Sequence, residues 1–433
     1  MILSSLDHRT RRVLALLVGA VILATLAGLR AWPADAMPSM NGPSGLECLD
    51  GGPSFDLWAT DGRVDMPDGN SVYVWGFVPD ASSEAWSPGP NLCVNEGDTV
   101  SVTLHNKLDE DVSIVFPGQE DVQAGGAPSQ PQFDGSNNLT SLAQAASANG
   151  GTLTYSFTAG KPGTYLYESG TDPQKQVQMG LAGALIVRPA GHPDWAYNDS
   201  STAFDPDREY LMLLQEIDPA LHEAVEAGRP YDISKFHPRY WTINGRSFPD
   251  TLAPNDARYL PNQPYGAMVT VEPFDQSSNP LPALIRYANA GMNDHPIHPH
   301  GNHVRLIAHD GYLLKNDSGG DLSYEKFTQV INSGQTWDGL FKWTDLENWS
   351  SSNPVPVQLP GKKNVAYGEH NLYSGTPYLG EQEDMPPSAN PHNECGEYYF
   401  IAHSHAAYEM QNWDQGMGGM TTFFRIDPPG GCQ

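Results

Sequence analysis

The sequence predicts an all-β protein built from two β-sandwich domains. Glycine and proline are abundant, at 43 and 37 of the 433 residues, and they separate short stretches in which apolar and polar residues alternate. Alternation places successive side chains on opposite faces of a strand, and Gly and Pro end strands in turns. One short helix is expected near residues 219–226, and long amphipathic helices are not evident.

The N-terminus has the three parts of an export signal. Arginine-rich residues 9–12 precede an apolar run at residues 13–29, and small residues follow at 34–36. This order predicts a signal peptide over residues 1–36, with export to the periplasm or the extracellular medium. Because the apolar run is close to the shortest that spans a bilayer, an uncleaved membrane anchor is the alternative. No other stretch is apolar enough to cross a membrane.

Residues 45–190 are predicted to form the first sandwich. Alternating strands such as residues 100–104 and 153–157 lie between Gly- and Pro-containing turns. A segment rich in Asp, Ser and Pro follows, and residues 191–208 are therefore predicted to be a linker.

Residues 209–430 are predicted to form the second sandwich. It opens with an apolar strand at residues 210–216. Residues 312–394 are rich in Gly, Ser, Asn and Pro and are longer than an ordinary loop connection. We expect this insertion to combine strands with a surface loop.

The four cysteines are an even number, which suits two disulfides in an exported chain. Three pairings are open. Pairing within each predicted domain favours Cys48 with Cys93 and Cys395 with Cys432.

Acidic residues outnumber basic ones by 51 to 23, which gives a formal net charge of -28. Such a chain repels the phosphate backbone of nucleic acids. Nucleic-acid binding is therefore excluded.

Histidines gather in two short tracts about a hundred residues apart. Alternate residues of an extended strand share a face, so the paired histidines of each tract point the same way. Two such strands side by side would present four imidazoles to one point, and imidazole suits copper, zinc, iron and nickel. The predicted ligands are His298, His300, His403 and His405.

The two tracts resemble a known pair of motifs. Residues 295–301 are similar to the His-Pro-x-His-x-His-Gly motif of multicopper oxidases, and residues 403–405 are similar to their His-Cys-His motif. Residues 283–291 and 304–311 resemble the strands that lead into and out of the first motif. The resemblance implies two cupredoxin-like Greek-key sandwiches, as in two-domain laccase-like and nitrite-reductase-like members, and copper as the metal.

Several copper ligands of the family are replaced in this chain. Ser404 stands where the family has the type 1 cysteine, and Glu409 stands at its last type 1 histidine, which leaves His295 as the matching type 1 ligand. A serine hydroxyl cannot supply the thiolate of a blue copper site. We therefore expect no blue copper centre and no four-copper laccase activity.

The first half has also lost its copper histidines. Residues 115–118 stand where the family has His-Trp-His-Gly, and Glu168 and Gly170 replace two histidines of a second motif. Packing as in the family would place Glu168 opposite the surviving imidazoles. Such a mixed site would favour zinc, manganese or iron over copper. Two-domain members build their cluster between subunits, so the resemblance also implies a homotrimer.

Three function classes follow, in order of preference. The first is an exported protein that binds copper or another transition metal and serves metal handling or a redox partner protein. The second is an oxidoreductase or hydrolase with a mononuclear His/Glu site. The third is a metal-free scaffold or a subunit of a redox assembly.

Overall fold

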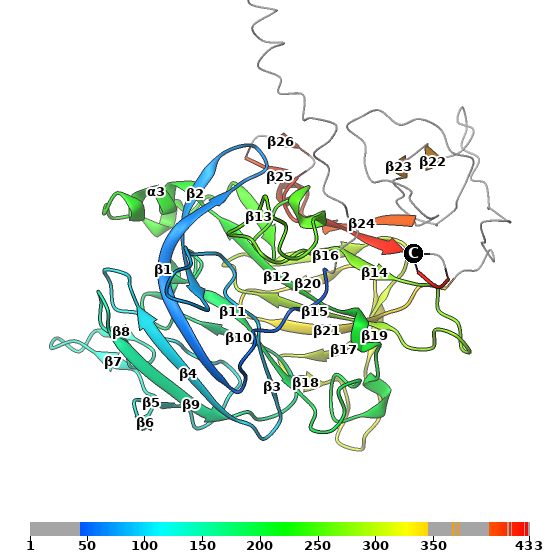
Figure 1. Cartoon of the computed structure of the whole chain (residues 1–433), viewed down its shortest axis with the longest axis horizontal. Coiled ribbons are helices and arrows are strands. Elements are labelled where there is room, and N and C mark those ends of the chain that lie inside the picture. The colour runs from blue at the N-terminus through cyan, green and yellow to red at the C-terminus, as the bar shows by residue number, and fades with distance from the viewer. Residues whose placement is uncertain are drawn as a thin grey trace, which may run out of the picture. The chain divides into compact units, whose positions relative to one another are not determined.

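The structure is a computed structural model. The residues it describes are 44–344, 366–367, 370–371, 398–413, 415–416, 418–427 and 429–431. The predicted signal peptide and the predicted Cys395–Cys432 pair lie outside these residues. The described residues form strands with few and short helices (Figure 1), which confirms the all-β class. No helix in this described part is long and apolar enough to cross a membrane.

Two sheets enclose a core in the first half of the chain. The larger contains, in spatial order, β2 (Ser71–Val78), β1 (Ser54–Asp65), β4 (Thr99–Asn106), β9 (Thr152–Thr158), β5 (Gln123–Ala124) and β6 (Ala127–Pro128). The smaller contains β10 (Gly163–Glu168), β11 (Ala182–Arg188) and β3 (Leu92–Asn95). In β4 every second residue is buried, and Val100, Val102 and Leu104 among them join the core between the two sheets. The alternation in the sequence thus arises because one face of the strand meets the core.

Two further sheets enclose a core in the second half. The first contains β13 (Tyr240–Ile243), β12 (Glu209–Ile217), β15 (Ala283–Asn289), β21 (Thr336–Phe341), β17 (Val304–His309) and β18 (Tyr312–Leu313), with β19 (Tyr324–Lys326) also paired to β17. The second contains β14 (Val269–Val271), β27 (Thr421–Ile426), β24 (Tyr398–Ser404), β16 (His295–Pro299) and β20 (Gln329–Ile331). Tyr210, Ile285 and Phe424 are among the buried residues that fill this sandwich.

Short elements complete the described chain. They are α2 (Pro173–Gln176), α3 (Pro219–Glu226), η2 (Ser200–Thr202), η3 (Pro206–Arg208), η4 (Ile233–Lys235), η5 (Asp250–Leu252), η6 (Ala407–Glu409), β7 (Gln132–Phe133), β8 (Leu139–Ser141), β22 (Ala366–Tyr367), β23 (His370–Asn371), β25 (Gln411–Asn412) and β26 (Gln415–Gly416). Helix α3 is the predicted helix, and it begins where the Asp218 side chain accepts a hydrogen bond from the Ala220 N–H.

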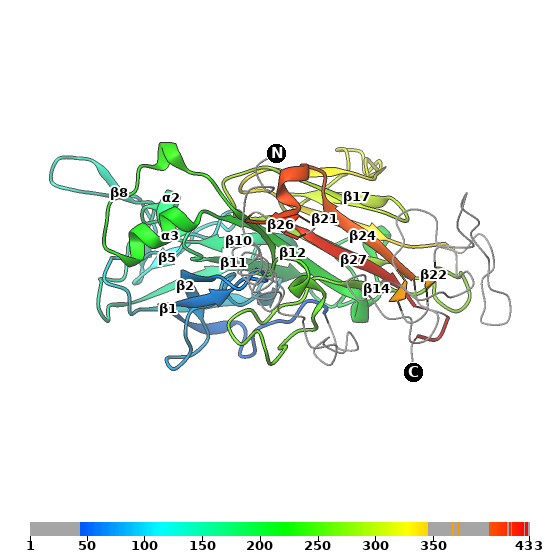
Figure 2. The same cartoon turned by 90° about the horizontal axis from the view of Figure 1, so that it is seen from above.

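The two halves share an apolar interface. Strands β10 and β11 lie beside β12 (Figure 2), and a buried cluster joins Leu166 and Ile186 of the first half to Leu213 and Ala288 of the second. The separation of such an interface would expose apolar surface to water, which is unfavourable.

A buried ionic network crosses the same interface. The Arg286 Nε donates to Glu209 at 2.7 Å, and the other oxygen of Glu209 contacts Arg188 at 2.7 Å. Arg286 also donates to Thr164, which donates to Asp338 at 2.6 Å. Arg188 and Thr164 come from the smaller first-half sheet, whereas the other three residues come from the larger second-half sheet. Buried charges of this kind persist because each has partners of opposite charge or hydrogen bonds.

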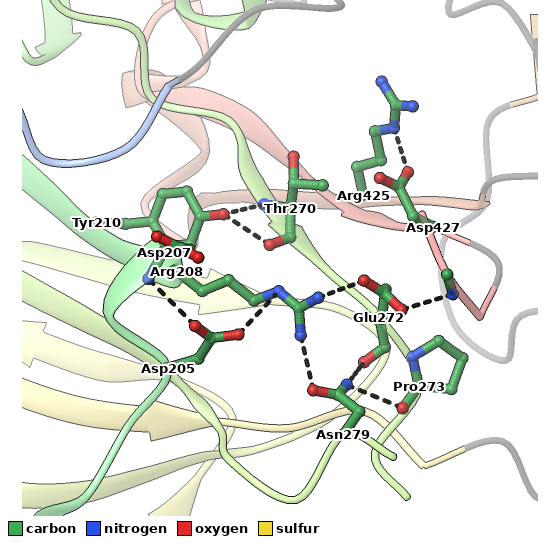
Figure 3. A network of polar contacts seen from close by, with 11 residues as sticks. Asp205, Asp207, Arg208, Tyr210, Thr270, Glu272, Pro273, Asn279, Arg425 and Asp427 are labelled. Atoms are coloured by element: carbon green, nitrogen blue, oxygen red, sulfur yellow. Dashed lines mark hydrogen bonds and ion pairs between the residues drawn. The ribbon is translucent and has the colours of Figure 1, made fainter. Parts of the chain in front are cut away.

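The predicted linker packs against the second half. Tyr197 and Phe204 lie in a buried cluster with Leu284 and Ile307. At its end, the Arg208 guanidinium contacts Asp205, Glu272 and Asn279, as Figure 3 shows. Glu272 also accepts a hydrogen bond from the Gly430 N–H at 2.7 Å, so the same cluster holds the last described residues.

Cys48 and Cys93 form a disulfide with a Cα–Cα distance of 5.6 Å, which confirms the first predicted pair. The bond joins the start of the described chain to β3.

Glu209→Gln tests the buried network. The change removes the carboxylate that Arg286 and Arg188 share and leaves Arg286 with Asp338, 3.6 Å away, as its remaining acidic partner. We expect a loss of about 3 kcal/mol of unfolding free energy. Urea unfolding at neutral pH measures this quantity. A loss below about 1 kcal/mol, the range of exposed pairs, would contradict the account of the interface.

Candidate metal centre

The two histidine tracts lie on neighbouring strands. Strands β16 and β24 lie side by side (Figure 1) and pair antiparallel, with His298 directly opposite His403. The pairing continues past the strand ends, because the His300 N–H donates to the Ile401 carbonyl at 3.0 Å and the His405 N–H donates to the Pro296 carbonyl at 2.7 Å. The side-by-side arrangement predicted from the sequence is therefore confirmed.

The strand alternation puts the predicted histidine pairs on one face. Along β16 the residues 295, 297 and 299 are buried, whereas His298 and His300 are half-buried on the other face. The ring centroid of His298 lies 4.6 Å from that of His300, 5.4 Å from that of His403 and 5.0 Å from that of His405. Four imidazoles thus gather at one place.

Three of these imidazoles converge more closely. One ring nitrogen from each of His298, His300 and His403 lies within 4.8 Å of the others, and the Nε2 atoms of His300 and His403 are 3.2 Å apart. Bonds of about 2.0–2.1 Å to a tetrahedral metal place imidazole nitrogens about 3.4 Å apart, so small side-chain movements suffice. Among the described residues no other group of three or more His, Cys, Asp or Glu side chains has this geometry.

Hydrogen bonds orient two of the rings. The His403 Nδ1 lies 2.8 Å from the Ser404 carbonyl oxygen, which only accepts, so Nδ1 carries the proton and Nε2 keeps its lone pair. The His298 Nδ1 lies 2.7 Å from the Thr328 hydroxyl. Partners of this kind on the second ring nitrogen are typical of metal-binding histidines.

The electrostatics of the site keep these rings neutral. Burial, together with the neighbouring histidines, lowers the pKa of His300 to about 4. Burial also lowers the pKa values of His298 and His403, with further contributions from the nearby imidazoles. Because a metal binds the neutral imidazole, this environment favours metal over protons at neutral pH.

The first half is closely packed where the resemblance implies copper histidines. Val115 and Glu168 bond to each other through their backbones, with N···O distances of 2.8 and 3.1 Å. A Cβ atom at Gly170 would lie 2.8 Å from a Val115 methyl group and 3.0 Å from the Ser113 hydroxyl. A side chain at position 170 would therefore meet packed atoms.

Glu168 is half-buried at the end of β10, and burial raises its pKa. Within one chain the converging group consists of histidines, and Glu168 does not belong to it. Its predicted role as a ligand thus requires a second subunit and stays a prediction.

His295 lies on the opposite face of β16 from the histidine group. It is fully buried, with its Nε2 3.0 Å from Glu216 and its Nδ1 3.0 Å from Glu409. Burial alone would lower its pKa, but the hydrogen bonds to both carboxylates raise the pKa of His295 to about 9. Both nitrogens therefore bind carboxylates in this structure, and the predicted role of His295 as a metal ligand has no support from the observed contacts.

Sequence reasoning missed Glu216. Its one signal is a carboxylate in the run at residues 210–217, which is apolar apart from Gln215 and Glu216 and is buried throughout in β12. A fully buried Glu needs a partner, but the sequence does not identify which residue supplies it.

Comparisons with known proteins agree with this fold and site. A family model described as multicopper oxidase matches residues 82–192. Laccase-3 of Oryza sativa subsp. japonica is 29% identical over 263 residues, which are 58% of this chain and 38% of the relative. L-ascorbate oxidase of Cucurbita maxima is 34% identical over 159 residues, 37% of this chain and 24% of the relative. The matches thus span less than half the length of these curated relatives.

Solved structures share the architecture. The Blue Copper Oxidase from Nitrosomonas europaea superposes with a TM-score of 0.56 and 19% identity, over 87% of this chain and 85% of that chain. The multicopper oxidase mgLAC gives a TM-score of 0.56 and 19% identity, over 88% and 87%. The class is therefore that of cupredoxin-like β-sandwich proteins. Residues 82–192 match the multicopper oxidase model, and part of the chain is similar to laccases and to an ascorbate oxidase.

The pH dependence of stability tests the buried imidazole. An ordinary His pKa is about 6.5, and the folded pKa of His295 is about 9. Its stabilisation is therefore fully present below pH 6.5 and is lost as the pH rises from 6.5 through 9. Urea unfolding between pH 6 and 10 should show this decline in the wild type and a smaller decline in His295→Gln. Equal declines in the two proteins would contradict the assignment.

Proposed function

We propose that this protein is an exported member of the multicopper oxidase superfamily that binds copper or another transition metal at a residual histidine site, and that it is not a four-copper laccase. The carrying observation is the convergence of His298, His300 and His403, one nitrogen from each lying within 4.8 Å. His405 lies at the edge of the group and is the proposed fourth imidazole.

The replaced ligands support the exclusion of laccase chemistry. Ser404 offers no thiolate, and Glu409 accepts a hydrogen bond from His295 where the resemblance implies a type 1 histidine. A four-electron reduction of dioxygen needs a site that collects electrons singly and a cluster that delivers them. The described residues contain neither set of ligands in full.

Copper is the first choice of metal, because the group within one chain is made of imidazoles alone and the relatives include laccases and an ascorbate oxidase. A bound metal would supply a Lewis acid or a redox centre. The chain's own residues hold the ring nitrogens toward one point, fix the His403 tautomer through the Ser404 carbonyl, and keep the imidazoles unprotonated.

The second candidate function is an oxidoreductase or hydrolase with a mononuclear site. Three converging protein ligands match the number that catalytic zinc sites use, which leaves a fourth position for water or substrate. The half-buried state of the three histidines supports access for a small molecule.

Export is part of the proposal. The order of residues at 1–36 supports a signal peptide, and the Cys48–Cys93 disulfide suits an oxidising compartment.

A double variant tests the metal site. His298→Ala combined with His403→Ala removes two of the three converging imidazoles, so we expect metal affinity to fall by 100-fold or more, consistent with the loss of direct ligands rather than their outer partners. Isothermal titration with Cu²⁺ and with Zn²⁺ measures the change. The matched control combines His192→Ala with His309→Ala, two histidines outside the group, and should bind as the wild type does. Undiminished binding by the H298A/H403A protein would contradict the proposal.

The mixed site with Glu168 has a separate test. A homotrimer built as in two-domain relatives would bring Glu168 of one subunit to the histidines of another. In that case Glu168→Ala should weaken Zn²⁺ or Mn²⁺ binding about 10-fold, with light scattering showing a trimer. A monomeric wild-type protein, together with unchanged Zn²⁺ and Mn²⁺ affinity in Glu168→Ala, would exclude both the trimer and a ligand role for Glu168.

A further inference from the structure

A second buried group lies behind the histidine site. Glu216, His295 and Glu409 are all inaccessible to solvent, and the imidazole of His295 joins the two carboxylates through contacts of 3.0 Å on each side. Because Nδ1 and Nε2 point in different directions, the carboxylates do not converge on one point as metal ligands do. Among the described residues, these three side chains do not belong to the group formed by His298, His300 and His403.

The surrounding chain is shaped to hold Glu216. Its second oxygen accepts hydrogen bonds from the Gln178 side chain at 2.9 Å and from the Met292 N–H at 2.7 Å. A Cβ atom at Gly291 would lie 2.1 Å from a Glu216 oxygen, so only glycine fits beside the carboxylate. Such complete pairing is what a buried charge requires, because an unpartnered one would cost several kcal/mol.

We call Glu216, His295 and Glu409 the triad. It connects the segments that carry the metal-site histidines. His295 is the first residue of β16, which leads to His298 and His300. Glu409 ends η6, which follows directly from β24 and His405. Glu216 belongs to β12 in the other sheet of the same sandwich. The imidazole therefore ties the start of β16 to β12 through Glu216 and to η6 through Glu409. The neighbouring Pro296 carbonyl accepts a hydrogen bond from the His405 N–H.

Register decides whether the metal site exists. A slip of β16 by one residue would turn His298 and His300 to the buried face, because strand side chains alternate. An anchor at residue 295 with two separate partners opposes such a slip.

We propose that His295, held between Glu216 and Glu409, is a positioning residue that fixes β16 against the β24–η6 segment and so maintains the convergence of His298, His300 and His403. This inference rests on the proposed metal site. It assigns to His295 a role through its neighbours, without a bond to the metal.

The test compares His295→Gln and Glu409→Gln with the matched control Glu209→Gln. Glu209 lies on β12, as Glu216 does, and it belongs to the other buried network, so its loss lowers stability without contact to the triad. Each protein is loaded with Cu²⁺ below its unfolding temperature. Chelator competition gives the Kd, and electron paramagnetic resonance gives the copper hyperfine coupling and the number of coordinated nitrogens.

If His295 positions β16, the Kd for Cu²⁺ should rise 10- to 100-fold in both triad variants, which is the range seen for outer partners of metal ligands. The copper hyperfine coupling should also change. The number of coordinated nitrogens should stay that of the wild type. The control should keep the wild-type Kd and spectrum. If His295→Gln does not fold, Glu409→Gln carries the test, since it leaves the imidazole bonded to Glu216.

Other outcomes overturn the inference in distinguishable ways. Wild-type affinity and spectra in both triad variants would make the triad purely structural. The loss of one coordinated nitrogen in His295→Gln alone would make His295 a ligand. A wild-type chain that binds no metal would overturn the proposed function itself, before any variant is compared.

Discussion

The antiparallel pairing of β16 with β24 is the contact on which the proposed site depends. It places His298 opposite His403, and the backbone bonds beyond the strand ends extend the same register to His300 and His405. Neither strand has the site alone, because each offers only one pair of imidazoles. The flanking strands β20 and β27 pair with these two, so His298 and His403 lie on interior strands of a sheet, which hold them more firmly than loops would.

Two other regions where the resemblance implies copper ligands have other contacts in this structure. In the first half, Val115 fills space beside Gly170, where a side chain would now collide. Behind the histidine site, a carboxylate at Glu409 and a second at Glu216 enclose the remaining imidazole of His295. The first region is closely packed around Gly170, and the second holds a paired ionic group. Both nitrogens of His295 are thus paired with carboxylates, whereas the second oxygen of Glu409 is buried without a hydrogen-bond partner.

Much of this arrangement could be predicted from the sequence. The alternation in residues 100–104, the helix at 219–226 and the Cys48–Cys93 pair are confirmed because each depends on local pattern or on simple pairing within one region. The shared face of the two histidine pairs is confirmed for the same reason, since a strand has period two. The partners of His295 could not be predicted in full. Glu216 lies 79 residues away and reaches it only because the two sheets of the second half pack face to face.

The central claim is that the surviving histidines hold a metal. Elemental analysis with visible and electron paramagnetic resonance spectra, on exported protein purified without chelator, tests it most directly. The account predicts about one transition-metal ion per chain and no intense blue absorption, since three or four imidazoles bind one ion and no thiolate is present. Protein that stays metal-free even after reconstitution would contradict the claim and point to a scaffold, and an intense blue band would contradict the role given to Ser404.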